Sequence, residues 1–183
     1  GPADHNYVKI YEEKFARYRD RNVAILEIGY GEGKSANMWK DYFSNAIIAI
    51  LDKNDISNKH DNVIIVKGDQ GNRADLKRFV GSVDGTDIAI IIDDGSHKYK
   101  DQQVSLFYLF QHLMSGGIYC IEDLDCLKAN KRSEKYSTRH LIQSIIDHTS
   151  MTTPWIGKDD KKHILSLVGK CDIVERLAVL ERK

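Results

Sequence analysis

The stretch that decides the fold is Ile90-Ile91-Ile92-Asp93-Asp94-Gly95-Ser96-His97. Its first part is short, apolar and β-branched, which is typical of a buried strand in a parallel sheet. A second run, Ile118-Tyr119-Cys120-Ile121-Glu122-Asp123-Leu124, repeats this pattern and also places acidic residues after the apolar part. Open α/β sheets bind their ligands at the carboxyl ends of their strands. The two runs therefore predict neighbouring strands whose acidic ends form one site.

Around these runs, apolar segments alternate with helical patterns, which is the signature of βαβ units. The predicted fold class is α/β, with a mostly parallel sheet and a C-terminal antiparallel hairpin. The expected strands span residues 23–28, 46–51, 63–66, 88–92 and 118–121, with a hairpin over 171–181. The expected helices span residues 7–20, a segment capped by Ser35, 73–80, 100–113 ended by Gly116-Gly117, 140–148, and a segment capped by Asp159 through 168. The polar, basic segment 126–138 predicts a mobile loop or lid.

Composition excludes several classes of partner. The chain has 183 residues, a length that suits a single domain over residues 1–183. Its 27 basic and 27 acidic side chains balance, which argues against nucleic acid, since phosphates favour a basic surface. No apolar run reaches the ~20 residues of a membrane helix, so no membrane partner is expected. Three cysteines without metal-ligand spacing favour a reducing compartment, hence a cytoplasmic location.

A glycine turn follows the first expected strand, in Leu26-Glu27-Ile28-Gly29-Tyr30-Gly31-Glu32-Gly33. Glycines let backbone amides approach a ligand without Cβ interference, and the spacing is tighter than in the dinucleotide fingerprint, which argues against NAD. Asp52 follows about 20 residues later, where a ribose-binding acid belongs. Asp69 could accept a hydrogen bond from an adenine amine, helped by Gln70. These features predict a nucleoside-bearing cofactor. The structural alternatives are a tight strand–helix turn, a polar loop residue at Asp52 and a turn cap at Asp69.

Four acidic residues stand at the two central strand ends: Asp93, Asp94, Glu122 and Asp123. Adjacent carboxylates repel, so a cation or hydrogen-bond donor is needed to keep them ionised. Successive strand residues point to opposite faces, which predicts Asp93 on the cofactor side and Asp94 on the metal side. Hard oxygen ligands suit Mg²⁺ and tolerate Mn²⁺. His97 is the natural base beside them, because histidine is the side chain suited to proton transfer near neutral pH. The alternatives are acids with structural roles only and a surface histidine.

These motifs, together with Gly68-Asp69-Gln70, resemble class I S-adenosylmethionine methyltransferases. They are most similar to the metal-dependent sugar O-methyltransferases of macrolide biosynthesis, of the mycinamicin type, over roughly residues 5–125. The resemblance implies a Rossmann-like fold, S-adenosylmethionine and Mg²⁺ (or Mn²⁺) as cofactors, and catalysis by His97 as general base with Asp94. It also implies a metal site of Asp94, Glu122 and Asp123. The predicted cofactor-binding residues are Glu27, Gly29, Gly31, Gly33, Ser35, Asp52, Asp69, Gln70 and Asp93.

The chain departs from the family after the expected strand 46–51. The family usually has a second acid close to the aspartate that ends this strand, but here Lys53-Asn54 separate Asp52 from the next acid, Asp55. The loops after residue 125 match no pattern of the family, so the acceptor site is not transferred. Gly1-Pro2 resembles a protease scar from recombinant expression, and we expect a domain excised from a longer protein. A further resemblance, to the methyltransferase domain of chlorovirus multi-domain glycosyltransferases, implies rhamnose as the acceptor.

The predicted activity is methyl transfer to a hydroxyl of a sugar or glycan, such as a deoxysugar like rhamnose. Two alternatives remain open at this stage. One is a catechol-type or other small-molecule O-methyltransferase, which would apply the same metal chemistry to an aromatic diol. The other is a carbohydrate-binding module without turnover. The sequence specifies neither the hydroxyl that is modified nor the oligomeric state.

Overall fold

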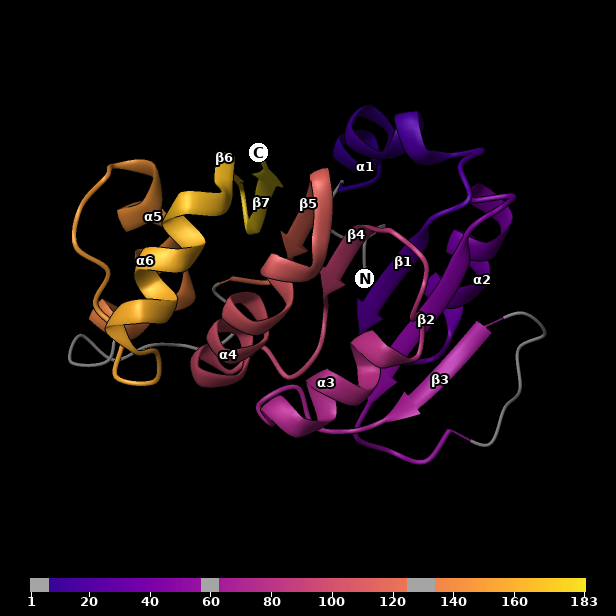
Figure 1. Cartoon of the computed structure of the whole chain (residues 1–183), viewed down its shortest axis with the longest axis horizontal. Helices are drawn as coiled ribbons and strands as arrows, with labels where there is room; N and C mark the ends of the chain where they lie inside the picture. The colour runs from indigo at the N-terminus through magenta and orange to yellow at the C-terminus, as the bar shows by residue number, and fades with distance from the viewer. Residues whose placement is uncertain (1–6, 57–62, 125–133) are drawn as a thin grey trace.

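The computed structural model describes residues 7–56, 63–124 and 134–183. In this part of the chain, one sheet has the strand order β3-β2-β1-β4-β5-β7-β6, with helices packed on both faces (Figure 1). The strands are β1 Ala24–Ile28, β2 Ile47–Asp52, β3 Val63–Lys67, β4 Ile88–Asp93, β5 Leu113–Ile121, β6 Val168–Val174 and β7 Leu177–Arg182. The helices are α1 Tyr7–Phe15, α2 Lys34–Tyr42, α3 Arg73–Gly81, α4 Tyr99–Leu109, α5 Thr138–Ile146 and α6 Lys158–Leu167, with 3₁₀ turns η2 Ala16–Tyr18, η3 Phe110–His112 and η4 Glu134–Tyr136.

The strand directions confirm the expected fold class, a mostly parallel Rossmann-like sheet with an antiparallel C-terminal hairpin. Strands β1 to β5 pair in parallel, whereas β7 runs antiparallel to both of its neighbours, β5 and β6. From β1 the chain builds outward through β2 and β3, and then returns to place β4 on the other side of β1. The strand order therefore reverses between β1 and β4, which is where α/β sheets open a ligand crevice.

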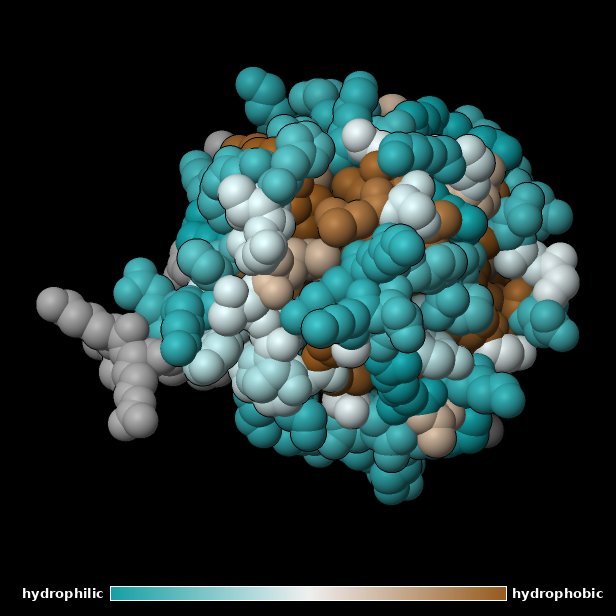
Figure 2. Space-filling view, turned by 60° about the vertical axis from the view of Figure 1, so that its left-hand side comes forward, coloured by the Kyte–Doolittle hydropathy of each residue, from teal (hydrophilic) through white to brown (hydrophobic). Residues whose placement is uncertain are grey.

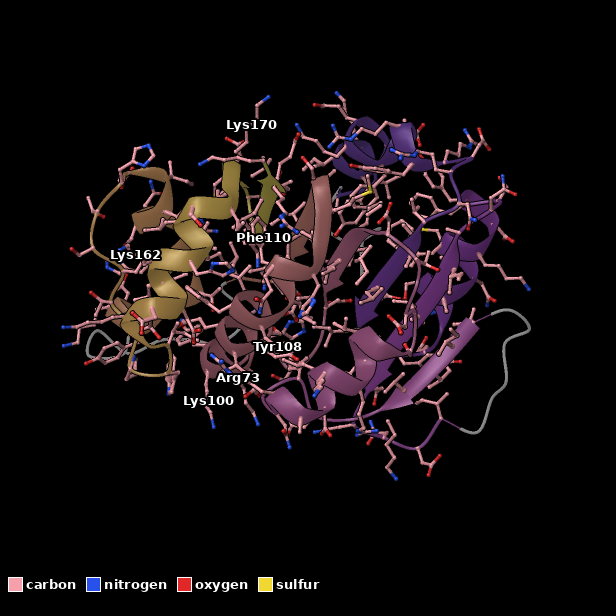
Figure 3. The ribbon with its side chains drawn as sticks, viewed as in Figure 1. Arg73, Lys100, Tyr108, Phe110, Lys162 and Lys170 are labelled. Atoms are coloured by element: carbon pink, nitrogen blue, oxygen red, sulfur yellow. The ribbon has the colours of Figure 1, made fainter. Side chains whose placement is uncertain are left out.

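The core consists of two apolar layers, one on each face of the sheet. Alternate strand residues contribute to each layer, as the two-residue period of a strand requires. Helices α3, α4, α5 and α6 cover the first face, and α1 with α2 covers the second with an aromatic cluster. Arg73 at the start of α3 pairs with Asp160 of α6 at 2.5 Å, joining two helices that both pack on α4 (Figure 3).

The predicted helix over 100–113 is wrong at its C-terminal end. Helix α4 ends at Leu109, and β5 already begins at Leu113, so Gly116-Gly117 lie within a strand and end no helix. Gly116 has a φ of +76°, and its carbonyl oxygen accepts a 2.6 Å hydrogen bond from the Tyr18 hydroxyl. A glycine in a strand marks such an irregularity as readily as a helix end, so local sequence could not separate the two.

Two predicted helix caps are also wrong. Gly33 precedes α2 in the left-handed conformation, with φ +76°, and Ser35 lies inside the first turn. Gly157 precedes α6, and Asp159 lies inside that helix. Of the predicted lid over 126–138, residues 126–133 fall outside the described part of the chain, whereas residues 134–138 form η4, Ser137 as the cap of α5, and the start of α5.

Among the described residues, few large hydrophobic side chains are individually exposed. The large exposed hydrophobic side chains are Val8, Leu165 and Val174. Figure 2, which turns the side of α5 and α6 forward, shows apolar surface framed by hydrophilic side chains. No helix in the described residues is long and apolar enough to span a membrane.

Candidate active site

A cavity of about 510 Å³ opens at the carboxyl edge of the sheet, where the strand order reverses. It is lined by Ile28, Gly29, Gly31, Leu51, Asp52, Lys53, Asn54, Gly68, Asp69, Gln70, Asp94, Gly95, Ser96, His97, Lys98, Asp101 and Asp123. The ends of β1, β2, β3, β4 and β5 thus contribute to one space. Many of the residues singled out from the sequence meet here, although they come from five separate strand ends.

The glycine turn forms one wall of this cavity, and its first two glycines have different neighbours. A Cβ atom on Gly29 would lie 2.3 Å from the Asp94 carbonyl oxygen, so the β4 loop can approach only a glycine. Gly31 has a φ of +53° and faces open space, with no atom within 4 Å of a Cβ placed there. Gly31 is therefore free to present its backbone to a ligand in the cavity.

Asp52 joins the glycine turn to the loop after β2. Its Oδ2 accepts a 2.9 Å hydrogen bond from the Tyr30 amide, and its Oδ1 accepts a 2.7 Å bond from the Asn54 amide. Asp69 lines the cavity from the end of β3, and its Oδ1 accepts a 2.7 Å hydrogen bond from the Gly71 amide. Both carboxylates are thereby fixed in orientation at the cavity wall, as ligand-binding acids need to be.

Asp93 does not line the cavity in the structure. Its carboxylate is completely buried and accepts hydrogen bonds from Gln70 Nε2 at 3.0 Å and Ser105 Oγ at 2.7 Å. Burial raises the pKa of Asp93, and these hydrogen bonds oppose the shift. Gln70 lines the cavity and also accepts a 2.6 Å hydrogen bond from the Ser96 amide. Asp93 and Gln70 together therefore hold the loop that carries Asp94 and His97.

Glu27, Gly33 and Ser35 also lie outside the cavity lining. Glu27 is 2 % exposed and accepts a 3.2 Å hydrogen bond from Trp39 Nε1. Burial raises its pKa to about 7, against the hydrogen bonds from Ser35 and Trp39, which lower it. Glu27, within β1, thus holds α2 in place through Trp39, and its pKa lies well above the ordinary value.

This burial predicts a stability change with pH that Glu27→Gln should remove. Below pH 4.5, the ordinary pKa of a glutamate, Glu27 is protonated in both the folded and the unfolded protein. Between pH 4.5 and about 7, Glu27 releases its proton only in the unfolded protein. The wild-type free energy of unfolding should therefore fall through this window. Each unit of pKa difference corresponds to about 1.36 kcal/mol. By pH 7, the free energy of unfolding of Glu27→Gln should therefore have risen by up to about 3 kcal/mol relative to that of the wild type.

Urea denaturation at several pH values between 4.5 and 8 would measure this difference. Glu13→Gln, at a side chain that is 71 % exposed, serves as the matched control and should follow the wild-type profile. Parallel profiles for wild type and Glu27→Gln would contradict the raised pKa.

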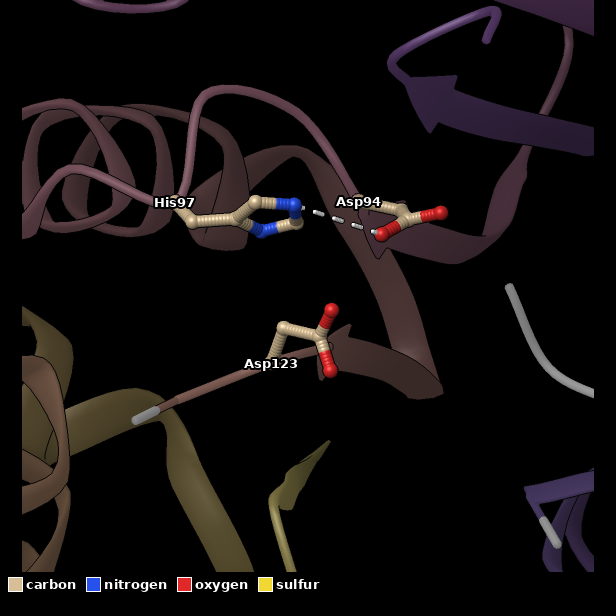
Figure 4. A group of neighbouring side chains, drawn as sticks. All are labelled: Asp94, His97 and Asp123. Atoms are coloured by element: carbon tan, nitrogen blue, oxygen red, sulfur yellow. Dashed lines mark ion pairs between the residues drawn. The ribbon is translucent and has the colours of Figure 1, made fainter. Parts of the chain in front are cut away.

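Three of the predicted reactive side chains line this cavity and converge on one another (Figure 4). Asp94, His97 and Asp123 each place one ligand atom within 4.8 Å of the others. His97 Nε2 lies 3.9 Å from Asp94 Oδ1, and the Asp123 carboxylate points into the space between them. Both His97 and Asp123 have a φ of +55°, a left-handed conformation that costs a non-glycine residue energy and concentrates at functional sites.

Glu122, the remaining predicted metal ligand, lies beside this group without being part of it. It is 2 % exposed and accepts a 2.6 Å hydrogen bond from the Tyr11 hydroxyl. Burial and the negative charge of Asp94 raise the pKa of Glu122 to about 8. A divalent cation would relieve this repulsion, and carboxylate oxygens with an imidazole suit Mg²⁺ or Mn²⁺. The residues present therefore fit a metal ion.

Sequence reasoning missed several residues of this site. Lys53 and Asn54 line the cavity, and so does Asp101, which accepts a 2.8 Å hydrogen bond from the Ser96 hydroxyl. Arg176, in the turn between β6 and β7, lies 3.4 Å from Asp123 Oδ1. Lys53 and Asn54 directly follow Asp52, so position alone could have identified them. No sequence signal marks Arg176, because only the pairing of β7 with β5 brings it near.

Curated proteins similar to this chain include sugar O-methyltransferases, although no family model matches it. A 2'-O-methyltransferase of rhamnosyl tetracenomycin C from Streptomyces olivaceus is 37 % identical over 66 % of this chain and 33 % of its own length. A 3'-O-methyltransferase from the same organism is 32 % identical over 97 % of this chain and 49 % of its length. The chain thus spans a third to half of these curated relatives.

Among solved structures, the fold is similar to that of the MycE methyltransferase from the mycinamycin biosynthetic pathway, in complex with Mg and S-adenosylhomocysteine. The TM-score is 0.82 at 26 % identity, covering 97 % of this chain and 50 % of MycE. A second MycE complex also holds mycinamycin VI and superposes with a TM-score of 0.81. The Rossmann-like methyltransferase fold expected from the sequence is therefore confirmed.

Proposed function

We propose that this chain, similar over most of its length to sugar O-methyltransferases, transfers a methyl group from S-adenosylmethionine to a sugar hydroxyl with the help of Mg²⁺. One observation carries the proposal: Asp94, His97 and Asp123 converge in the same cavity that is lined by the glycine turn and Asp52. A base, a cation site and a cofactor-sized space thus adjoin one another. Such adjacency is what positioning a hydroxyl next to an activated methyl group requires.

The cofactor would occupy the cavity between the glycine turn and the loops after β2 and β3. Gly29 and Gly31 offer backbone there, whereas Asp52 and Asp69 offer carboxylates for ribose and adenine. When bound, S-adenosylmethionine supplies a methyl group already activated as a sulfonium. The named contents of the MycE complexes, Mg and S-adenosylhomocysteine, support this assignment.

The chain's own residues would orient the acceptor and move its proton. Asp94 and Asp123, supported by Glu122, would hold Mg²⁺, which when bound lowers the pKa of a hydroxyl it contacts. His97 stands beside these carboxylates and would receive the hydroxyl proton as general base. Its Nδ1 is buried and has no hydrogen-bond partner among the described residues.

The proposed acceptor is a deoxysugar such as rhamnose, within a glycan or glycoside. The names of the tetracenomycin relatives specify rhamnosyl groups, and a MycE structure contains mycinamycin VI, which supports the class of acceptor but not the individual sugar. A catechol-type methyltransferase and a non-catalytic carbohydrate-binding module remain the alternatives. A cytoplasmic location and the absence of nucleic-acid and membrane partners also stay proposals.

A panel of acceptors would separate these possibilities. The purified protein with S-adenosylmethionine and Mg²⁺ is offered rhamnosides, other deoxysugar glycosides and catechols, and S-adenosylhomocysteine formation is measured. We expect turnover with rhamnosides. Turnover with catechols alone would refute the sugar acceptor, whereas binding of glycosides without turnover of any compound would indicate a binding module.

Cofactor binding is expected to depend on Asp52. Loss of a carboxylate that accepts ribose hydroxyls costs about 1.5–3 kcal/mol, so Asp52→Ala should weaken S-adenosylhomocysteine binding by roughly 10- to 100-fold in calorimetry. Asp55→Ala is the control, because this nearby acid is 84 % exposed and pairs with Lys67. An affinity for S-adenosylhomocysteine that is unchanged in Asp52→Ala would reject this cofactor site.

A further inference from the structure

Helix α1 reaches the acidic site from the face of the sheet covered by the aromatic cluster. The hydroxyl of Tyr11 donates a 2.6 Å hydrogen bond to Glu122 Oε1, across 111 residues of sequence. Both side chains are buried, with 3 % and 2 % of their surfaces exposed. This contact therefore lies in the interior, where a hydrogen bond is electrostatically stronger than in water.

The ring of Tyr11 is held in a single orientation. It stacks on Phe15, with centroids 4.8 Å apart and an interplanar angle of 11°, and it meets the edge of Trp39 at 5.5 Å and 68°. Phe15 and Trp39 are themselves buried. Because the ring cannot turn without breaking these contacts, the hydroxyl is a donor at a fixed position.

The backbone of Glu122 is fixed as well. Its amide donates a 2.9 Å hydrogen bond to the Asp93 carbonyl, and its carbonyl accepts a 3.2 Å hydrogen bond from Gln102 Nε2. The remaining freedom of Glu122 is rotation of its side chain. The bond from Tyr11 restricts this rotation by holding one carboxylate oxygen.

We propose that Tyr11 is a positioning residue for the divalent cation and acts through Glu122. The inference rests on the proposed function, in which Glu122 supports Mg²⁺ together with Asp94 and Asp123. Hydrogen-bond partners behind a ligating carboxylate typically contribute 10- to 100-fold in metal affinity. A helix that precedes the first strand thereby becomes part of the active site, and the aromatic cluster acts as its rigid support.

Direct titration of the cofactor-free protein with Mn²⁺, with free metal detected by electron paramagnetic resonance, tests this role without reference to activity. Tyr11→Phe keeps the ring and its stacking and removes only the hydroxyl. We expect it to weaken Mn²⁺ binding by about 10- to 100-fold while leaving S-adenosylhomocysteine affinity within twofold of wild type.

Tyr18→Phe is the matched control. Tyr18 lies on the same face and donates a 2.6 Å hydrogen bond to the Gly116 carbonyl, without contacting an acid of the site. Loss of the Tyr18 hydroxyl should leave Mn²⁺ affinity unchanged. Thermal unfolding of Tyr11→Phe and Tyr18→Phe shows whether either variant is destabilised. An equal loss of Mn²⁺ affinity in Tyr18→Phe would overturn the proposal, because the effect would then be general destabilisation.

A double-mutant cycle gives a second measurement. In a Glu122→Gln background, Tyr11→Phe should cause less than a twofold further loss, since the two residues act as a unit. If the effects of Tyr11→Phe and Glu122→Gln on the free energy of Mn²⁺ binding were fully additive, the proposed action of Tyr11 through Glu122 would be overturned. A wild-type protein that binds no Mn²⁺ would contradict the proposed function and this inference together. Wild-type Mn²⁺ binding that Tyr11→Phe leaves within twofold would overturn the role of Tyr11 alone.

Discussion

Replacing His97 with alanine is expected to lower kcat by roughly 10²–10⁴-fold, the usual effect of removing a positioned general base. A sugar hydroxyl is a poor nucleophile near neutral pH and must lose its proton as the methyl group arrives. His97 lines the cavity, with its Nε2 3.9 Å from Asp94 Oδ1, on a loop held by the hydrogen bond from the Ser96 amide to Gln70. Rapid-quench or steady-state assays of S-adenosylhomocysteine formation would measure the loss.

The competing explanation is that Mg²⁺ alone acidifies the hydroxyl and His97 only shapes the pocket. His97→Gln separates the two, because glutamine keeps size and hydrogen bonding but cannot serve as a base near neutral pH. A near-wild-type kcat in this variant would overturn the assignment. His97 also belongs to the group that could hold a cation, so Mn²⁺ affinity is measured in parallel, and we expect both variants to retain it within a few-fold.

His148→Ala is the matched control for backbone strain. His148 shares the left-handed conformation, with φ +54° against +55° for His97, but it is exposed at the end of α5. Alanine at either position meets the same conformational cost. A selective fall in kcat for His97→Ala therefore reports on chemistry rather than on the loop.

Removal of divalent cations is expected to reduce methyl transfer to background while S-adenosylhomocysteine binding persists. A metal that polarises a substrate oxygen contributes several kcal/mol of charge stabilisation, which corresponds to about 10³-fold or more in rate. Asp94 and Asp123 offer oxygen ligands in one part of the cavity lining, whereas the cofactor would lie against the glycine turn and Asp52. Chelation followed by Mg²⁺ or Mn²⁺ addition, with turnover and calorimetry as the two measurements, would test this separation.

Asp94→Asn should produce the same separation through the protein. It removes one charge at the metal group, so Mg²⁺ should be needed at higher concentration and maximal turnover should fall. Asp55→Asn, at an exposed acid beyond the cavity, should leave both unchanged. Full activity after exhaustive chelation would contradict the metal site. Asp94, Glu122 and Asp123 would then be hydrogen-bond partners of the acceptor.

Much of the fold could be predicted because its signals are local. The β-branched run ending in Asp93 and the run ending in Glu122 are apolar on both faces, and only a strand covered on both sides buries such a run. The acids after them had to meet at one edge, since parallel strands share their carboxyl ends. The convergence of Asp94, His97 and Asp123 follows from that rule.

Other features depended on signals that are ambiguous within a short window. Two glycines after a helical pattern favoured a helix end, yet Gly116-Gly117 lie in β5, where the Tyr18 hydroxyl bonds to the Gly116 carbonyl. The alternation along β4 predicted different surroundings for Asp93 and Asp94, and in the structure Asp94 lines the cavity whereas Asp93 is buried. Only the contacts of Gln70 and Ser105 with the Asp93 carboxylate show that the buried acid supports the loop.

By itself, the sequence determined the strands, their acidic ends and the glycine turn, because steric preference and burial act on neighbouring residues. Tertiary structure alone decided that Tyr11 holds Glu122 and that Arg176 meets Asp123. These contacts join residues far apart in the chain. They exist only after α1 packs on the sheet and β7 enters between β5 and β6, and no periodicity within one segment encodes the distance between two packed elements.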